Sequence, residues 1–307
     1  MKITYLTLGL LLALLLGGRA AALPLPDSLY QRPEIQRELD YLRRHPAHLA
    51  RVRERAENWL PHLLPLLRER ALPASLAWLP AVESAYLPGA LSPAGAAGLW
   101  QLMPATAERF GVPMDTGFDG RFAPLTASRA ALAYLAWLHH HFDGDWLLAL
   151  AAYNAGEGRV RRAMERSGSR DFWHLPLPEE TRHYVPRFLA VQWLLRPPRA
   201  GTAPVLREHR VEGPVSLPQL AARLGVTVEQ LKRWNLALKG EWLSARREYS
   251  ILVKTTEQDG DDGFIRIQPQ PLFMARTAGL DLSAAGGLFG EAGPAFDFAP
   301  PPGWPGY

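Results

Sequence analysis

Apolar residues in the first quarter of the chain recur with a helical period. Between residues 27 and 70 they stand at spacings near three and four among many Arg and Glu residues, at Ile35, Leu39, Leu42, Leu49, Val52, Leu60, Leu63, Leu64 and Leu67. This pattern predicts amphipathic helices that pack one face against a larger body. Pro46, Pro61 and Pro65 should divide or kink the stretch, because proline cannot donate the hydrogen bond of a helix interior.

More helices are expected as far as residue 195. One should start near Pro73, kink or restart at Pro80 and end at Ser84 or Tyr86. The others are predicted at residues 100–110, 127–142, 146–153, 160–167 and 179–195. Loops rich in Pro and Gly should separate them at residues 88–98 and 113–124. Because no stretch here clearly alternates with a period of two, the body at 27–196 is predicted to be all-α.

The pattern changes after a linker at residues 197–204. Two strand candidates and two helix candidates then follow in the order β-α-α-β, at residues 205–211, 216–224, 228–234 and 249–253. They predict a small module at 205–255. Acidic and then Gly/Pro/Ala-rich sequence at 256–307 predicts a disordered tail.

The N-terminal residues predict export. Residues 1–22 combine Lys2, an uncharged apolar run at 6–16 and three alanines at 20–22, which is the pattern of a signal peptide. A single membrane anchor is the alternative, although the run is short for a bilayer span of about 20 residues. We therefore expect an exported protein of the periplasm or cell envelope.

Composition limits the chemistry. The chain has 307 residues, 48% of them hydrophobic, and a net charge of +4. This charge suits an anionic polymer and leaves peripheral membrane association open, but it is far from the dense basic patch of a nucleic-acid binder. The absence of Cys excludes a thiolate nucleophile, a disulfide and a Cys-based zinc site. His139, His140 and His141 point to different helix faces, so neither a metal nor another cofactor is predicted.

Glu83 is the main candidate for a catalytic group. It follows Ala81 and Val82 in a short helix that is otherwise apolar. Burial there would disfavour the charged carboxylate, raise its pKa and make it a general acid. Taken alone, a Glu on a helix face paired with Arg or exposed to solvent would be the commoner explanation.

Three further blocks change this interpretation. Residues 92–104 read SPAGAAGLWQLMP, residues 151–156 read AAYNAG, and residues 180–185 read ETRHYV. Gly95 and Gly98 allow close approach of backbone to a ligand, and the amide and phenol groups can hydrogen-bond a sugar.

With Glu83, these blocks resemble in order the family 1 lytic transglycosylases of the SLT type, which have a goose-lysozyme-like helical fold. The strings FDGDWLL at 142–148 and DFWHLPLP at 171–178 resemble the membrane-bound lytic murein transglycosylase D branch. The resemblance covers residues 30–195. It implies a lyase that cuts the β-1,4 bond between N-acetylmuramic acid and N-acetylglucosamine in peptidoglycan glycan strands and leaves a 1,6-anhydro sugar.

The resemblance also implies roles for individual residues. Glu83 matches the single catalytic acid and base. Supporting or cleft-lining roles fall on Ser92, Gln101, Met103, Tyr153, Asn154 and Tyr184. Trp100 is the tryptophan expected to stack on a sugar.

Other carboxylates have structural explanations. Asp119 should organise the loop before the long helix, and Glu157 should cap its turn or meet Arg159. Glu180 begins a helix, where its charge suits the dipole. A lysozyme-like hydrolase on the same fold would need an Asp that holds a water opposite Glu83, and Asp119 is the position left open for it. A non-catalytic wall-binding protein is the third hypothesis.

The C-terminal module resembles a degenerate LysM domain. The similarity rests on residues 211–217 and 225–227, Leu231 and the pair Trp234 and Asn235. The usual Gly-Asp-Thr-Leu is altered, and the closing Gly and Ile-Pro are absent. Both glycan binding and a purely structural cap remain open, as does the oligomeric state.

Overall fold

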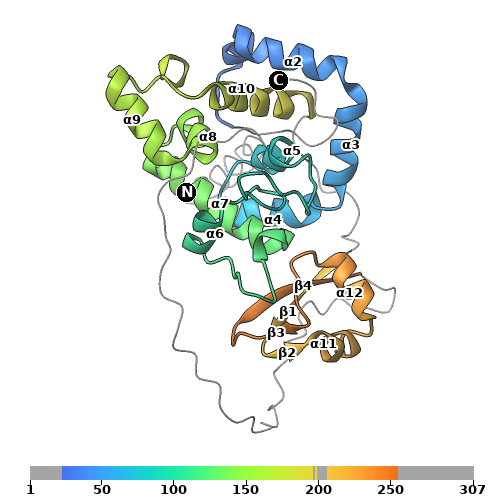
Figure 1. Cartoon of the computed structure of the whole chain (residues 1–307). Coiled ribbons are helices and arrows are strands. Elements are labelled where there is room, and N and C mark those ends of the chain that lie inside the picture. Colours follow the sequence, from blue (N-terminus) through green and yellow to red (C-terminus); the bar gives the residue numbers. More distant parts are fainter. Residues whose placement is uncertain (1–22, 196–197, 199–205, 255–307) are drawn as a thin grey trace, which may run out of the picture.

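The computed structural model describes residues 23–195, 198 and 206–254 (Figure 1). The predicted signal peptide, most of the predicted linker and the predicted disordered tail lie outside the described residues. Within them a helical body is followed by a smaller mixed module, so the expected mainly α fold class is confirmed. No helix in this part of the chain is long and apolar enough to cross a membrane.

The N-terminal stretch forms several short helices, as its prolines predict. They are η1 (Asp27–Gln31), α2 (Pro33–Arg44), α3 (Pro46–Glu57) and α4 (Leu60–Glu69). Pro46 opens α3 and Pro61 lies in the first turn of α4, where a proline leaves no intrahelical hydrogen bond unmade. Pro65 lies inside α4, which continues past it.

The rest of the body supplies the cleft and its support. Its elements are η2 (Ala74–Trp78), α5 (Leu79–Glu83), α6 (Pro104–Arg109), η3 (Gly120–Phe122), α7 (Pro124–His141), α8 (Trp146–Ala155), α9 (Glu157–Ser167), η4 (Phe172–His174) and α10 (Glu179–Leu195). Helix α8 is apolar over most of its circumference, so it lies inside, packed against α7, α9 and α10. Helix α10 also packs on α2 and α5 and so links the N-terminal helices to the cleft.

Two predicted helices are shorter than expected. The segment from Pro73 to Tyr86 is a 3-10 turn followed by the five-residue α5, which restarts at Pro80 as predicted. The helix predicted at 100–110 begins only at Pro104. Gln101 has a φ of 44°, which is not helical. Met103 is extended because Pro104 disfavours helical geometry in the residue before it.

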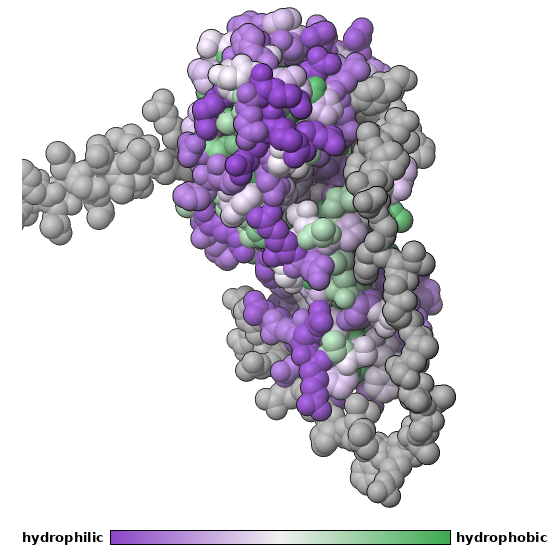
Figure 2. Space-filling model, turned by 60° about the vertical axis from the view of Figure 1, so that its left-hand side comes forward, coloured by the Kyte–Doolittle hydropathy of each residue, from purple (hydrophilic) through white to green (hydrophobic). Residues whose placement is uncertain are grey.

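The module has the predicted β-α-α-β order with two short additional strands. Strand β1 (Leu206–Glu212) pairs antiparallel with β4 (Glu248–Lys254), and β2 (Val215–Ser216) with β3 (Trp242–Leu243). Helices α11 (Leu217–Arg223) and α12 (Val228–Trp234) lie between them in the chain. The surface of the body is mostly hydrophilic, and apolar residues are visible where it meets the module (Figure 2).

Asn235 joins α12 to β4 inside the module and yields a stability prediction. Its side-chain amide donates to the carbonyls of Leu231 (2.9 Å) and Leu252 (2.8 Å) and accepts from the Leu252 amide (2.7 Å). Asn235→Ala leaves the buried amide and carbonyl of Leu252 without this partner and should lower the free energy of unfolding by roughly 2–4 kcal/mol in chemical denaturation. Lys232→Ala, which breaks a surface pair with Glu241, should lower it by less than about 1 kcal/mol. Equal effects would contradict this role for Asn235.

Candidate active site

Glu83 is held at the end of α5 by a tightly fixed turn. Ala85 and Tyr86 have positive φ angles of 49° and 59°, so the helix cannot continue. The Ser84 hydroxyl donates to the carbonyl of Leu99 at 2.8 Å, and the buried Tyr86 hydroxyl donates to the carbonyl of Ala77. These contacts stabilise the turn and hold the Glu83 backbone in place.

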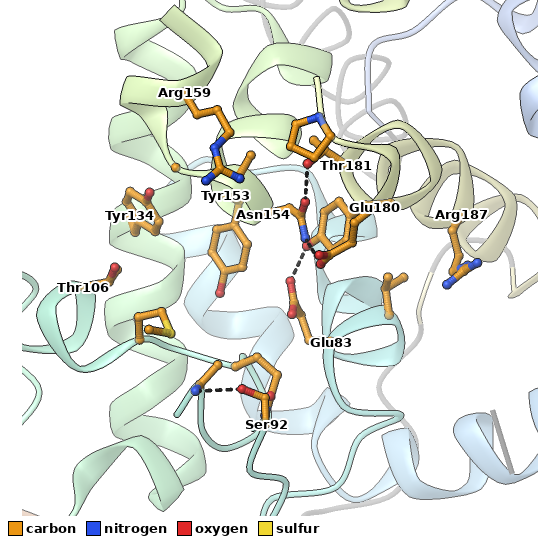
Figure 3. A pocket seen from close by; sticks show the side chains of 18 residues that line it. Glu83, Ser92, Thr106, Tyr134, Tyr153, Asn154, Arg159, Glu180, Thr181 and Arg187 are labelled. Atoms are coloured by element: carbon orange, nitrogen blue, oxygen red, sulfur yellow. Dashed lines mark hydrogen bonds between the residues drawn. The ribbon is translucent and has the colours of Figure 1, made fainter. Parts of the chain in front are cut away.

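The Glu83 carboxyl faces a cleft (Figure 3). Helices α5, α8 and α10 enclose this cleft together with the Gly-rich loop, residues 89–103. The seven residues to which the resemblance assigns catalytic or cleft-lining roles all line this cleft: Glu83, Ser92, Gln101, Met103, Tyr153, Asn154 and Tyr184. Residues from segments up to 101 positions apart in the chain therefore meet in one place.

The environment of Glu83 favours its protonated form. Burial, opposed by a hydrogen bond from Tyr184 and assisted by the negative charge of Glu180, raises its pKa from 4.5 to about 8. The carboxyl is therefore mostly protonated at neutral pH, as a general acid must be.

Two tyrosines complete this part of the cleft. The Tyr184 hydroxyl donates to Oε1 of Glu83, and the Tyr153 hydroxyl donates to the carbonyl of Trp100 at 2.9 Å. Burial, with the nearby Glu83 charge, raises the pKa of both phenols well above their usual value. Both tyrosines therefore remain hydrogen-bond donors throughout the neutral range.

Asn154 holds two residues of α10 in place. Its Nδ2 donates to Oε1 of Glu180 at 3.0 Å, and its Oδ1 accepts from the Thr181 hydroxyl at 2.7 Å (Figure 3). The end of α8 is thereby fixed to the start of α10. Glu180 lies in the first turn of α10 as predicted, and it also lines the cleft, which the sequence did not indicate.

The Gly-rich loop places two polar side chains at the opposite wall. The Ser92 hydroxyl accepts from the Ala96 amide at 2.9 Å, and Nε2 of Gln101 donates to the Gly98 carbonyl at 2.9 Å. Gly98 has a φ of +79°, a conformation that favours glycine. These bonds fix the curvature of the loop above the cleft.

The structure tests several other predictions. Asp119 does organise its loop, because it accepts from the Arg121 amide and pairs with the Arg121 guanidinium at 2.8 Å. Of the two roles predicted for Glu157, the pairing with Arg159 is wrong, because its carboxylate pairs with Arg109 at 2.8 Å. The same carboxylate also bonds the backbone of its own residue at the start of α9, in keeping with the predicted cap.

The stacking role predicted for Trp100 is also wrong. Its side chain is completely buried, and its Nε1 donates to the Ser128 hydroxyl at 2.8 Å. The ring therefore belongs to the core beneath the cleft and cannot stack on a bound sugar.

Other cleft residues were not predicted from the sequence. They include Thr106, Tyr134, Arg159, Pro178, Thr181 and Arg187. Thr181 and Arg159 lie in or next to the motif blocks, which was a usable signal. Tyr134 and Arg187 reach the cleft only through the packing of α7 and α10, and Arg187 is held by Glu38 of α2 at 3.0 Å.

The three consecutive histidines lie apart from the cleft-lining residues. His139 stacks on Trp146 and His141 on Trp137, with ring centroids 4.0 and 4.6 Å apart. Among the residues that the structure describes, no group of three His, Cys, Asp or Glu side chains is arranged to hold a metal ion.

The raised pKa of Glu83 predicts how stability depends on pH. The folded state binds the proton of Glu83 more tightly than the unfolded chain does. The resulting contribution to the free energy of unfolding is therefore fully present below about pH 4.5 and is lost as the pH rises through about 8. The free energy of unfolding of Glu83→Gln should equal that of the wild type near pH 4.5. At pH 9 it should be higher than that of the wild type by roughly 2–4 kcal/mol. Chemical denaturation across this range, with the exposed Glu229→Gln as control, measures the effect. A difference that does not change with pH would contradict it.

Comparison with known proteins shows what this cleft resembles. Residues 66–176 match the family described as "Transglycosylase SLT domain". The membrane-bound lytic murein transglycosylase D of Escherichia coli K12 is 35% identical over 254 residues, which cover 79% of this chain and 55% of that protein. The soluble lytic murein transglycosylase of Salmonella typhimurium is 38% identical over 116 residues, 35% of this chain and 18% of that protein.

Solved structures give partial overlaps. An inactive variant of the lytic transglycosylase Slt from Pseudomonas aeruginosa is 33% identical, with a TM-score of 0.38 over 45% of this chain and 24% of that one. A complex of the 70-kDa soluble lytic transglycosylase with bulgecin A is 23% identical, with a TM-score of 0.39 over 60% of this chain and 39% of that one.

This chain spans about half the length of transglycosylase D, at 55%. The LysM resemblance of the module stays a prediction, because the family match ends at residue 176. The resemblance of the body is confirmed: residues 66–176 match the transglycosylase SLT family, and the chain is 35% identical to transglycosylase D over 254 residues.

Proposed function

We propose that this protein is a lytic transglycosylase that cleaves the glycan strands of peptidoglycan, with Glu83 as acid and then base. The observation that carries the proposal is a protonated carboxyl, with a pKa of about 8, in the cleft of an SLT domain. The names of the murein transglycosylases to which the chain is similar support the choice of substrate.

In the first step, Glu83 donates its proton to the oxygen that links N-acetylmuramic acid to N-acetylglucosamine. The bond from this oxygen to C1 of the muramic acid breaks, and the acetamido oxygen of the same sugar stabilises the developing positive charge. The Tyr184 hydroxyl, which donates to Oε1, stabilises the Glu83 carboxylate that remains.

In the second step, the Glu83 carboxylate accepts the proton of the muramic acid's own 6-hydroxyl, and that oxygen bonds to C1. The product is a 1,6-anhydro sugar, no water is consumed, and Glu83 is protonated again. One carboxyl group is sufficient because the substrate provides the second function that two-carboxylate glycosidases build into the protein.

The other cleft residues bind and orient the sugars in this proposal. We assign the carboxamide oxygen of Gln101 and the Ser92 hydroxyl to the sugar's acetamido and hydroxyl groups. Met103 and Tyr153 form cleft wall, and Asn154 positions Glu180. These assignments rest on the shared cleft and on the hydrogen bonds of each side chain.

The hydrolase alternative requires a second carboxylate that activates a water opposite Glu83. Asp119 does not line the cleft and is paired with Arg121. Glu180 is the other carboxylate on the described cleft wall, and it accepts a hydrogen bond from Asn154. This arrangement favours the lyase. We propose the cell envelope as the location, in agreement with the predicted signal peptide and with peptidoglycan as substrate.

Digestion of purified sacculi tests the reaction directly. Mass spectrometry of the released muropeptides should show 1,6-anhydro ends, and Glu83→Gln should lower the rate by at least about 10³-fold, because no other group donates the proton. Reducing ends would instead identify a hydrolase, and binding without release would identify a wall-binding protein. Glu229→Gln on the module surface should cleave like the wild type.

The neighbours of Glu83 predict opposite shifts of the pH profile. In the wild type, kcat/KM should fall above about pH 8 as Glu83 loses its proton. Tyr184→Phe removes the hydrogen bond that lowers this pKa and should move the fall to higher pH. Glu180→Gln removes a charge that raises it and should move the fall to lower pH, each by about half a unit to one unit. Shifts in the same direction would contradict the assignment.

A further inference from the structure

We propose that Arg121 is a positioning residue through which the C-terminal module sets the geometry of the Gly-rich loop in the cleft. This loop comprises residues 89–103 and carries Ser92 and Gln101. The inference rests on the proposed function. It assigns the module a part in turnover that does not require the module itself to bind glycan.

Arg121 fastens the Gly-rich loop at its middle and near its C-terminal end. Its Nη1 donates to the carbonyl of Gly95 at 2.6 Å and to that of Leu102 at 3.4 Å. The other guanidinium nitrogens are held by Asp119, with Nε 3.0 Å from Oδ1 and Nη2 2.8 Å from Oδ2. The side chain is only 12% exposed. A planar guanidinium can make these bonds together, and a lysine cannot.

The backbone of Arg121 also contacts the loop. A Cβ atom built on Gly98 would lie 1.9 Å from the Arg121 carbonyl oxygen, so the two backbones pass without room for a side chain. The Gly98 amide donates to the carbonyl of Ala90 at 2.8 Å. A displacement of Arg121 must therefore displace the loop.

Arg121 in turn belongs to a segment, residues 113–123, that is bound to the module. The Asp119 amide donates to the carbonyl of Ala237 at 2.9 Å, and the Lys239 amide donates to that of Gly117 at 2.9 Å. The Tyr249 hydroxyl of β4 donates to Asp115 at 3.1 Å. These bonds come from backbone and side chains of the module, so this segment is effectively part of it.

The module and the two loops share one hydrophobic core. Phe118 is completely buried and meets the Tyr249 ring edge-on, with centroids 5.0 Å apart. Ala97 of the Gly-rich loop and Phe122 lie in the same cluster as Val211 and other core residues of the module. The module's own core is therefore completed by side chains of the catalytic body.

A second contact fixes the module against the long helix of the body. Arg129 of α7 forms a two-pronged ion pair with Glu208 of β1, with one of its bonds 2.7 Å long. Glu208 also accepts from the Ser250 hydroxyl. With this contact and the shared core, the module is packed directly against the body rather than tethered only by its linker.

A module that only anchors glycan and one that positions the loop predict different results with short substrates. Anchoring raises activity only where one glycan strand reaches both parts, through an increased effective concentration. Positioning raises activity on every substrate, because it acts on the cleft itself. A soluble peptidoglycan tetrasaccharide is the probe that separates them.

Arg121→Lys in the full chain is the central variant. It keeps the positive charge but loses the bonds to Gly95 and Leu102, and kcat/KM on the tetrasaccharide should fall on the order of tenfold. The pH at which activity falls should stay that of the wild type, because Glu83 is untouched. Arg233→Lys, on the exposed face of α12, is the matched control and should turn over like the wild type. Tyr249→Phe removes the hydroxyl that donates to Asp115 and accepts from the Ala245 amide, and it should lower kcat/KM about twofold.

Hydrogen exchange gives a readout that does not depend on turnover. The amides of Ala97 and Leu102 bond to each other's carbonyls at 3.1 Å, and they should exchange faster in Arg121→Lys but not in Arg233→Lys. Wild-type turnover in Arg121→Lys would overturn the proposal, whatever its exchange rates. If the wild type did not cleave the tetrasaccharide, the exchange rates alone would decide: unchanged exchange would overturn the positioning role, and faster exchange would support it. The proposed function itself would fail only if the wild type also left sacculi intact.

Discussion

The structure depends on keeping one carboxyl group away from water while leaving it open to a ligand. Glu83 meets this constraint at the end of a five-residue helix, where the chain turns through two residues with positive φ. The surrounding helices hold this group in two ways. The Tyr184 phenol of α10 donates a hydrogen bond to it, and residues of α5 and α8 form the wall beside it. Much of the helical body serves to hold α5, α8 and α10 in place around the Glu83 carboxyl group.

The sequence predicted most of the helices and every proposed site residue because both signals are local. Apolar residues at helical spacing predict a helix even when its packing partner is unknown. Each motif block likewise contains the residues of its own part of the cleft. What it missed depends on distant packing. Trp100 lies in a motif block, yet only the position of Ser128 on α7 shows that its ring is turned into the core. Glu157 finds Arg109 across 48 positions of chain rather than its neighbour.

Contacts between the body and the module were beyond sequence reasoning for the same reason. Residues 113–123 look like an ordinary loop in the sequence, with two aromatic residues, Phe118 and Phe122, and little periodicity. Only the fold shows that this loop is covered by β4 and by residues 237–239, which lie more than 100 positions later in the chain. Asp119 was correctly predicted as a loop organiser, but the carbonyl at Gly95 to which its partner Arg121 donates was not foreseeable.

The shared core has a consequence for how such chains evolve and are engineered. Modules joined only by flexible linkers can be exchanged, duplicated or lost with little effect on their neighbours. Here Phe118 and Phe122 would be left facing water by any cut between the body and the module. Recombination at this boundary therefore succeeds only if the loop at 113–123 changes with it. The two parts should be inherited together, as one unit of selection.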